Sequence, residues 1–376
     1  MKRFGAICLG LVLLTAPTAY AYEAVRLDSF SDAVHHWQNR HGKDYARYSD
    51  DQIVEIADNI LLYQRHNGGW IENQDPARKL DPQEIAAITT QKSDSRASFD
   101  NRNIYAQIEY LMAVYDQTKS ETYRAAAMKG LEFTLSQQMP VCGGWPHTLP
   151  PSTDYHHKLT IADEVTSGNL RMLRKISLKQ APFTSINEAT RQTTDAALKR
   201  GDDCVLKLQI RQNGKLTGWA GQYDPVNLAP SKGRTFELPA IVSQETVAML
   251  DYLMSIDHPT PQQIAAIEGA VSWLKRSQIK GYALKTIPLD PPVKYDYHTA
   301  TFDRELVADN KAPPLWARFY DLNDNSVVLA NRDEVRVKAY ADIHPERRSG
   351  YSWYGDWPQR LIAVEYPAWK ARHSVK

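Results

Sequence analysis

The chain has 376 residues, with 45 basic and 44 acidic side chains and three cysteines. This length allows a sizeable hydrophobic core, and a formal net charge of +1 gives no reason to expect a nucleic-acid or membrane-surface partner. The sequence contains no P-loop, G-x-S-x-G or H-E-x-x-H pattern. Because these motifs are missing, the sequence favours acid/base catalysis over nucleophilic or zinc-dependent catalysis.

Residues 1–21 have the pattern of an export signal. Lys2 and Arg3 form its basic start, residues 7–14 a short apolar run, and Ala19-Tyr20-Ala21 a cleavage site. The apolar run is too short to span a bilayer, as is every later apolar run. We therefore expect an exported monomer, periplasmic rather than fully secreted, with a single catalytic domain over residues 22–376.

Two cysteines, Cys142 and Cys204, remain after the signal. Export permits a disulfide, but the spacing alone is equally compatible with two separate buried thiols. The sequence has no CxxC motif and no Cys/His cluster, so a cysteine-bound metal is not expected.

Helical periodicity runs through most of the chain in order. It predicts helices over residues 29–41, 50–65, 104–117, 121–138, 163–176, 187–210, 243–256 and 261–276. The segment 76–98 is polar and irregular, and the helical pattern fades beyond Pro288. Valines and leucines around Asn331-Arg332-Asp333 predict short strands within residues 326–340.

A repeated unit accompanies these helices. Trp70, Trp145 and Trp219 stand 75 and 74 residues apart, and each follows a helix and a glycine-containing turn. A weaker fourth copy is expected at residues 271–282, around Trp273. Repeats of this length indicate an array of α-hairpins. We predict a mainly α fold, a closed (α/α) toroid of helix pairs with a few short β-strands; an open helical array is the alternative.

The most conspicuous irregular stretch covers residues 219–245 and carries Arg234 beside Gly233. Long irregular segments in compact domains are usually binding or catalytic loops. Polar stretches also stand at helix ends at 99–103, 161–164 and 331–333, and we expect all of them to face one cleft. Aromatic rings stack on sugars and arginine forks bind carboxylates, which favours an acidic sugar polymer.

Each candidate also has a purely structural explanation. Asp100 and Asp163 open helices, where acids serve as caps or complement the helix dipole. Arg234 and Arg332 could form ordinary surface ion pairs. Trp145 is better explained as a wedge between helix pairs than as a sugar platform.

Taken together, the motifs resemble those of the polysaccharide lyase family 10 pectate lyases, over nearly the whole mature chain. The resemblance rests on the order and spacing of N-G-G-W at 67–70, D-N at 100–101, G-G-W-P at 143–146, Q-Y-D-P at 222–225, R-T-F-E-L-P at 234–239, L-W-A-R-F-Y at 315–320 and E-R-R-S-G-Y-S-W-Y-G at 346–355. The chain departs from the family pattern at residues 71–73, at 330–334 and at Cys142.

This resemblance implies a helical toroid and the calcium-assisted β-elimination of α-1,4-polygalacturonate, which gives 4,5-unsaturated products. It implies that Arg234 is the base and that Asp100 and Asp163 bind Ca²⁺. It further implies a substrate-binding set made of Asp100, Asn101, Trp145, Glu237 and a late arginine, Arg318 or Arg332.

Arginine is an unfavourable base, because its side chain is normally protonated at every accessible pH and cannot then accept a proton. Ca²⁺ and neighbouring cations would have to disfavour its charge, and the rate should rise toward alkaline pH. Two other functions stay open. One is a glycoside hydrolase on the same toroid, with its paired carboxylates drawn from Asp100, Asp163 and Glu237; the other is a non-catalytic oligogalacturonate-binding protein.

Overall fold

The computed structural model describes residues 22–373, so the predicted export signal at residues 1–21 lies outside it. Within 22–373, no helix is both long and apolar enough to cross a membrane. The buried apolar side chains form one connected core that reaches from Phe30 to Trp369.

The eight predicted helices are confirmed, with ends that differ by a few residues. They are α1 (Ser31–His41), α2 (Ile53–Tyr63), α4 (Tyr105–Thr118), α5 (Glu121–Ser136), α6 (Val165–Ser177), α7 (Glu188–Leu208), α8 (Ser243–Met254) and α9 (Pro261–Arg276). Helix α9 begins where the sequence predicts, because Thr260 Oγ1 accepts the backbone N–H of Gln263 and Pro261 occupies the first turn. Four helices were not predicted from the sequence, namely α3 (Pro82–Thr90), α10 (Pro345–Gly350), α11 (Pro358–Arg360) and α12 (Tyr366–His373).

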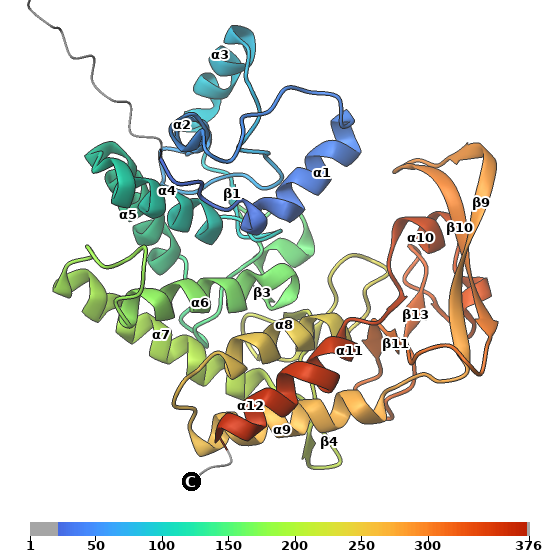
Figure 1. The fold of residues 1–376 in the computed structure, drawn as a ribbon. Coiled ribbons are helices and arrows are strands. Elements are labelled where there is room, and N and C mark those ends of the chain that lie inside the picture. Colours follow the sequence, from blue (N-terminus) through green and yellow to red (C-terminus); the bar gives the residue numbers. More distant parts are fainter. Residues whose placement is uncertain (1–21, 374–376) are drawn as a thin grey trace, which may run out of the picture.

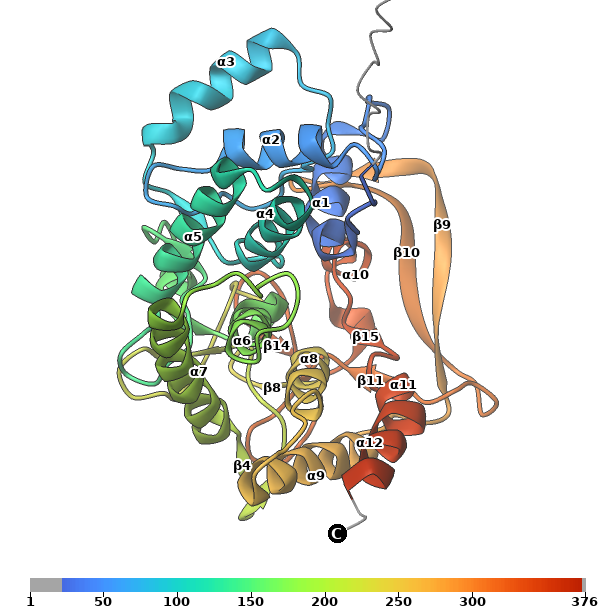
Figure 2. The same ribbon diagram turned by 60° about the vertical axis from the view of Figure 1, so that its left-hand side comes forward.

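The helices pair and then stack in a row. Helices α4 and α5, α6 and α7, and α8 and α9 pack as hairpins, while α2, α4, α6, α8 and α11 contact one another in turn. Figures 1 and 2 show the result as an arc that runs from α2 round to α9.

Four buried tryptophans repeat the same contact along this arc. The indole N–H groups of Trp70, Trp145, Trp219 and Trp316 donate to backbone carbonyls of Ile60, Thr134, Val205 and Leu274. The fourth copy of the unit is therefore built around Trp316. Trp273, which we predicted for this role, lies inside α9 and donates to Asn325.

An inserted β-hairpin explains this displacement. Strands β9 (Tyr282–Lys294) and β10 (Thr299–Ala308) pair antiparallel between α9 and Trp316. Trp316 follows Trp219 by 97 residues, and removal of the 27 residues from 282 to 308 restores a spacing of 70.

The predicted closed, mainly α toroid is wrong. The helix pairs stop at α9, and the side of the molecule opposite the arc is occupied by β9, β10 and short strands (Figure 1). The physical reason lies in β9, where Pro288, Pro291 and Pro292 remove backbone donors and bar a helix. The structure is an open arc of helix pairs with a substantial β component.

The remaining strands are two residues long and sit mostly at the ends of the helix pairs. They are β1 (Ala97–Ser98), β2 (Thr148–Leu149), β3 (Leu159–Thr160), β4 (Arg211–Gln212), β5 (Lys215–Leu216), β6 (Gln222–Tyr223), β7 (Pro230–Ser231), β8 (Ile241–Val242), β11 (Trp316–Ala317), β12 (Phe319–Tyr320), β13 (Leu329–Ala330), β14 (Arg336–Val337) and β15 (Tyr354–Gly355). The pair β13–β14 confirms the strands predicted within 326–340. Cys142 and Cys204, whose pairing the sequence left open, form a disulfide.

Candidate active site

One large cleft, with a volume of about 1390 Å³, opens on the inner side of the arc. All four polar stretches singled out in the sequence contribute side chains to it, together with α1, α8 and the β9–β10 hairpin. The predicted site residues Asp100, Asn101, Asp163, Arg234 and Glu237 line this cleft, as do Arg318 and Arg332.

Trp145 is not among the lining residues. Its side chain is fully buried, and its indole N–H donates to the Thr134 carbonyl at 2.8 Å. In this structure Trp145 therefore has no free ring face for a sugar, and its contacts are those of a wedge between α5 and the loop after it.

The backbone is strained where two acidic residues enter the cleft. Asn101 and Arg102 have φ values of 54° and 60°, and Asp163 and Glu164 have values of 52° and 59°. Non-glycine residues adopt this left-handed conformation at a cost of about 1–3 kcal/mol each, and such strain clusters at functional sites. The same local geometry thus precedes both α4 and α6.

Arg102 joins these two strained turns. Its guanidinium forms ion pairs with Glu164 at 2.8 Å and with Asp32 of α1 at 3.1 Å. Arg171 of α6 forms a second ion pair with Glu164. These contacts fix the turn that carries Asp100 relative to the turn that carries Asp163.

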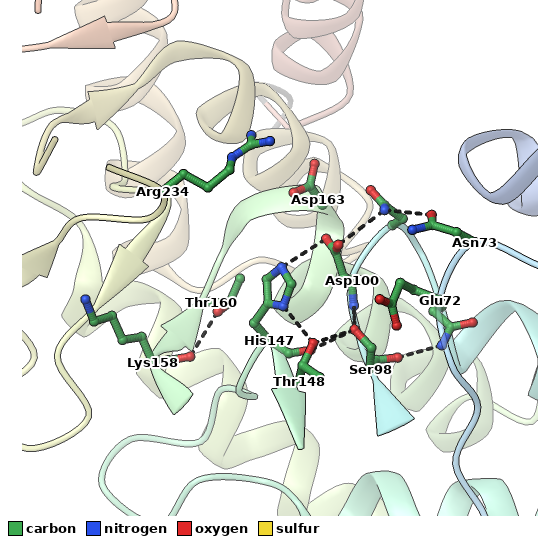
Figure 3. A network of polar contacts seen from close by, with 12 residues as sticks. Glu72, Asn73, Ser98, Asp100, His147, Thr148, Lys158, Thr160, Asp163 and Arg234 are labelled. Carbon is green, nitrogen blue, oxygen red and sulfur yellow. Dashed lines mark hydrogen bonds and ion pairs between the residues drawn. The ribbon is translucent and has the colours of Figure 1, made fainter. Parts of the chain in front are cut away.

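Asp100 is held by a polar network that Figure 3 shows. Its backbone N–H donates to Ser98 Oγ, which in turn contacts Thr148 Oγ1 at 2.7 Å. Asp100 Oδ1 pairs with His147 Nε2 at 3.3 Å, and Asp100 Oδ2 accepts from Asn101 Nδ2 at 3.2 Å. Burial alone would raise the pKa of Asp100, but His147 and Arg234 outweigh it and the net shift is downward.

The pKa of Asp163 is shifted in the opposite direction to that of Asp100. Burial, followed by the carboxylates of Asp100 and Glu245, raises the pKa of Asp163 well above its usual range. The backbone N–H of Asp163 donates to Glu245 Oε2 at 3.2 Å, whereas its carboxylate has no hydrogen-bond or ion-pair partner in the described part of the chain. In Figure 3 this carboxylate lies between Asp100 and Arg234.

Glu245 was not predicted as a site residue. It is buried in the first turn of α8, three residues after Val242, whose N–H donates to the Trp219 carbonyl. Asp163 stands three residues after Thr160, whose N–H donates to the Trp145 carbonyl in the same way. The sequence does not reveal this equivalence, because Asp163 follows Trp145 by 18 residues whereas Glu245 follows Trp219 by 26.

Arg234 faces these carboxylates from the opposite wall, and 47% of its side chain is exposed. Its Nη2 donates to Glu237 Oε1 at 2.5 Å, and its backbone N–H donates to Glu237 Oε2 at 2.8 Å. Desolvation alone would lower the pKa of Arg234, but Glu237 and Tyr351 outweigh it and raise that pKa. The surroundings therefore favour the charged guanidinium, which is the reverse of what the base role requires.

Two further residues complete this wall. Tyr351, missed in the sequence, donates its hydroxyl to Glu237 Oε1 at 2.7 Å and lies beneath both Arg234 and Arg318. Arg318 is 12% exposed and pairs with Glu245 at 3.3 Å. Arg318 is thus fixed beside the carboxylates, deep in the cleft.

Arg332 lies further out. It holds Glu346 through two hydrogen bonds of 3.1 Å, from Nε and from Nη2. The two late arginines that the resemblance left as alternatives therefore occupy different parts of the cleft.

The oxygen donors fit a hard divalent cation. Ca²⁺ takes oxygen ligands, and the cleft offers the carboxylate of Asp163, which has no partner among residues 22–373, and the carboxylate of Asp100, with Glu245 adding negative charge. Within residues 22–373, no group of three or more His, Cys, Asp or Glu side chains is close enough to hold a metal alone. A cation here would need further oxygens from water or from a bound anion.

The comparisons with known proteins agree with this chemistry. The family described as pectic acid lyase matches residues 64–362. A family 10 polysaccharide lyase from Cellvibrio cellulosa is 26% identical, with a TM-score of 0.69 over 92% of this chain and 98% of its own. A mutant of that lyase, solved in complex with trigalacturonic acid, matches at the same identity, TM-score and share of this chain, and over 99% of its own.

A search of curated proteins finds no match. The family match nevertheless covers most of the chain and includes every lining residue named above except those of α1. The chain therefore belongs to the pectic acid lyase family and is a pectate lyase of polysaccharide lyase family 10.

Proposed function

We propose that this chain is an exported, monomeric pectate lyase of one catalytic domain that cleaves polygalacturonate by calcium-assisted β-elimination, with Arg234 as the base. The observation that carries the proposal is the placement of the free Asp163 carboxylate opposite the half-exposed Arg234 guanidinium. The trigalacturonic acid bound to the Cellvibrio relative supports an acidic oligosaccharide as substrate.

The acidic residues and the arginines have different proposed roles. Asp100 and Asp163 would hold Ca²⁺, which neutralises the uronate carboxylate and stabilises the charge that develops there. Arg318, fixed beside Glu245, would orient the uronate from the deep side of the cleft. Glu237 would act on the substrate indirectly, because its two oxygens bind Arg234 and the Tyr351 hydroxyl.

In the reaction, neutral Arg234 takes the proton from C5. The electrons of the C5–H bond form the C4–C5 double bond, and O4 departs and takes a proton from water. Only the neutral fraction of Arg234 is competent, and Glu237 keeps this fraction small. The rate should therefore rise with pH.

The product distinguishes this function from its alternatives. The purified protein is incubated with polygalacturonate, with Ca²⁺ or with chelator, and the ultraviolet absorbance of the unsaturated uronide is followed. We expect the absorbance to increase only with Ca²⁺. New reducing ends without absorbance would indicate a hydrolase, and binding without either change would indicate a non-catalytic protein.

The carboxylate of Glu237 should control the pH dependence. Because Glu237 raises the pKa of Arg234, Glu237→Gln should lower that pKa and move the alkaline rise of the rate to lower pH. The maximum rate should fall, because the amide holds the guanidinium less firmly. The measurement is the pH–rate profile at saturating substrate and Ca²⁺.

Glu237→Asp is the matched control, since it keeps the negative charge and should leave the alkaline rise near its original pH. A profile of Glu237→Gln that coincides with the wild type, or that moves to higher pH, would contradict this role.

A further inference from the structure

The tip of the β9–β10 hairpin places an exposed aromatic ring in the cleft. Tyr297 is 69% exposed and lines the same cleft as Asp163 and Arg234. The Arg332 guanidinium covers one ring face at 3.9 Å from the centroid. Because most of the residue remains exposed, the opposite ring face is open as far as residues 22–373 are concerned.

The turn that carries this ring, and the arginine that lies against it, are held in place although the ring is exposed. The turn beside it closes through the Tyr295 N–H, which donates to the His298 carbonyl at 2.9 Å. The His298 ring is fixed by a 3.0 Å contact between its Nε2 and Ser349 Oγ in α10. Arg332, which lies against the ring, is itself held by Glu346. The orientation of Tyr297 therefore costs little further entropy on binding.

A row of alternating rings and guanidinium groups leads from Tyr297 to the proposed base. The Arg332 guanidinium lies 3.9 Å from the Tyr297 ring and 5.3 Å from the Phe236 ring, and the Arg234 guanidinium lies 5.1 Å from the same Phe236 ring. Two side chains thus stand between Tyr297 and Arg234. A sugar on Tyr297 is therefore a different residue of the polymer from the one that meets Arg234.

The chemistry of the pair suits a uronate. A tyrosine face stacks on the apolar face of a pyranose ring. Arg332 uses Nε and Nη2 for Glu346, which leaves Nη1 without a partner in the described residues and able to donate to a carboxylate. The resemblance already implies that Arg332 can bind a uronate; we propose that Tyr297 adds an aromatic platform beside it and thereby forms an outer subsite for one galacturonate unit away from the reacting bond.

This proposal rests on the proposed substrate class, and it predicts a dependence on chain length. In Tyr297→Ala the ratio of kcat/KM for long to short oligogalacturonates should fall roughly 2- to 10-fold, the value of one aromatic stacking contact. Tyr297→Phe keeps the ring and should keep the ratio. The matched control is Tyr282→Ala, which removes a 44% exposed tyrosine from the base of the same hairpin, outside the cleft lining.

Binding provides a test that does not need turnover. Calorimetric titration of an Arg234→Ala background with a long oligogalacturonate should show weaker binding when Tyr297→Ala is added, and the same binding when Tyr282→Ala is added. An equal loss for all chain lengths, or no loss in Tyr297→Ala, would overturn the subsite. Binding that depends on Tyr297 in a protein that forms no unsaturated product would overturn the proposed reaction and leave the subsite standing.

Discussion

Arg234→Ala and Arg234→Lys should each reduce the formation of unsaturated product by about 10²–10⁴-fold, the usual contribution of a general base. Alanine removes the base. Lysine keeps the charge but loses the planar fork that reaches Glu237 through Nη2. The initial rate of absorbance increase on polygalacturonate, at saturating Ca²⁺ and alkaline pH, measures both variants.

The fold should survive these changes, because the Arg234 side chain is half-exposed and its backbone N–H can still donate to Glu237. Thermal unfolding of each variant checks this. Arg336→Ala is the matched control, since it removes an arginine that pairs with Asp321 at 2.8 Å outside the cleft lining. If either Arg234 variant kept a rate close to that of the control, Arg234 would not be the base.

The helix pairs could be predicted because their signals are local. Apolar residues at helical spacing, the Thr260–Pro261 start of α9 and the recurrent tryptophans each act within a few turns of the chain. Closure of a ring depends instead on the chain beyond the last helix pair. Strand β9 is mostly exposed and has three prolines, so its pattern is neither helical nor clearly alternating, and the hairpin was missed.

Part of the cleft lining was predictable from the sequence. Arg234 looks out of place in a long irregular loop, whereas Asp100 and Asp163 were singled out by the polar stretches and family-like motifs that contain them. Glu245 was missed because an acidic residue in the first turn of a helix is ordinary. The effect of Glu237 on the pKa of Arg234 depends on how two side chains meet in space, and neighbouring residues in the sequence do not reveal it.

The stacking of the inner helices explains why three carboxylates line one cleft. Asp100 lies five residues before α4, Asp163 lies two residues before α6, and Glu245 lies in the first turn of α8. The stacking of these three helices therefore brings like charges to one cleft. Burial, followed by repulsion from Asp100 and Glu245, raises the pKa of Asp163, and a bound cation would relieve that repulsion. The arc of helix pairs thus gathers three carboxylates near the starts of successive inner helices, where a cation would be favoured.

Asp163→Asn should therefore weaken Ca²⁺ binding. Loss of a residue that only supports a metal ligand costs roughly 10–100-fold in affinity, and loss of the ligand Asp163 itself should cost more. Asparagine has nearly the same shape and tolerates the left-handed backbone at this position, where φ is 52°. The substitution removes the negative charge and leaves the turn intact. The Ca²⁺ concentration at half-maximal rate should rise accordingly, and excess Ca²⁺ should restore part of the activity.

Two measurements separate lost metal binding from a disturbed fold. Calorimetric titration with Ca²⁺ in the presence of a trisaccharide substrate, on an Arg234→Ala background, should show the weakened site directly. Asp203→Asn is the control, because this carboxylate pairs with Lys199 on α7 outside the cleft lining, and its removal should leave the Ca²⁺ dependence as it was. If Asp163→Asn kept the Ca²⁺ dependence of the control, Asp163 would not be a Ca²⁺ ligand. The raised pKa of its carboxyl group would then need another explanation.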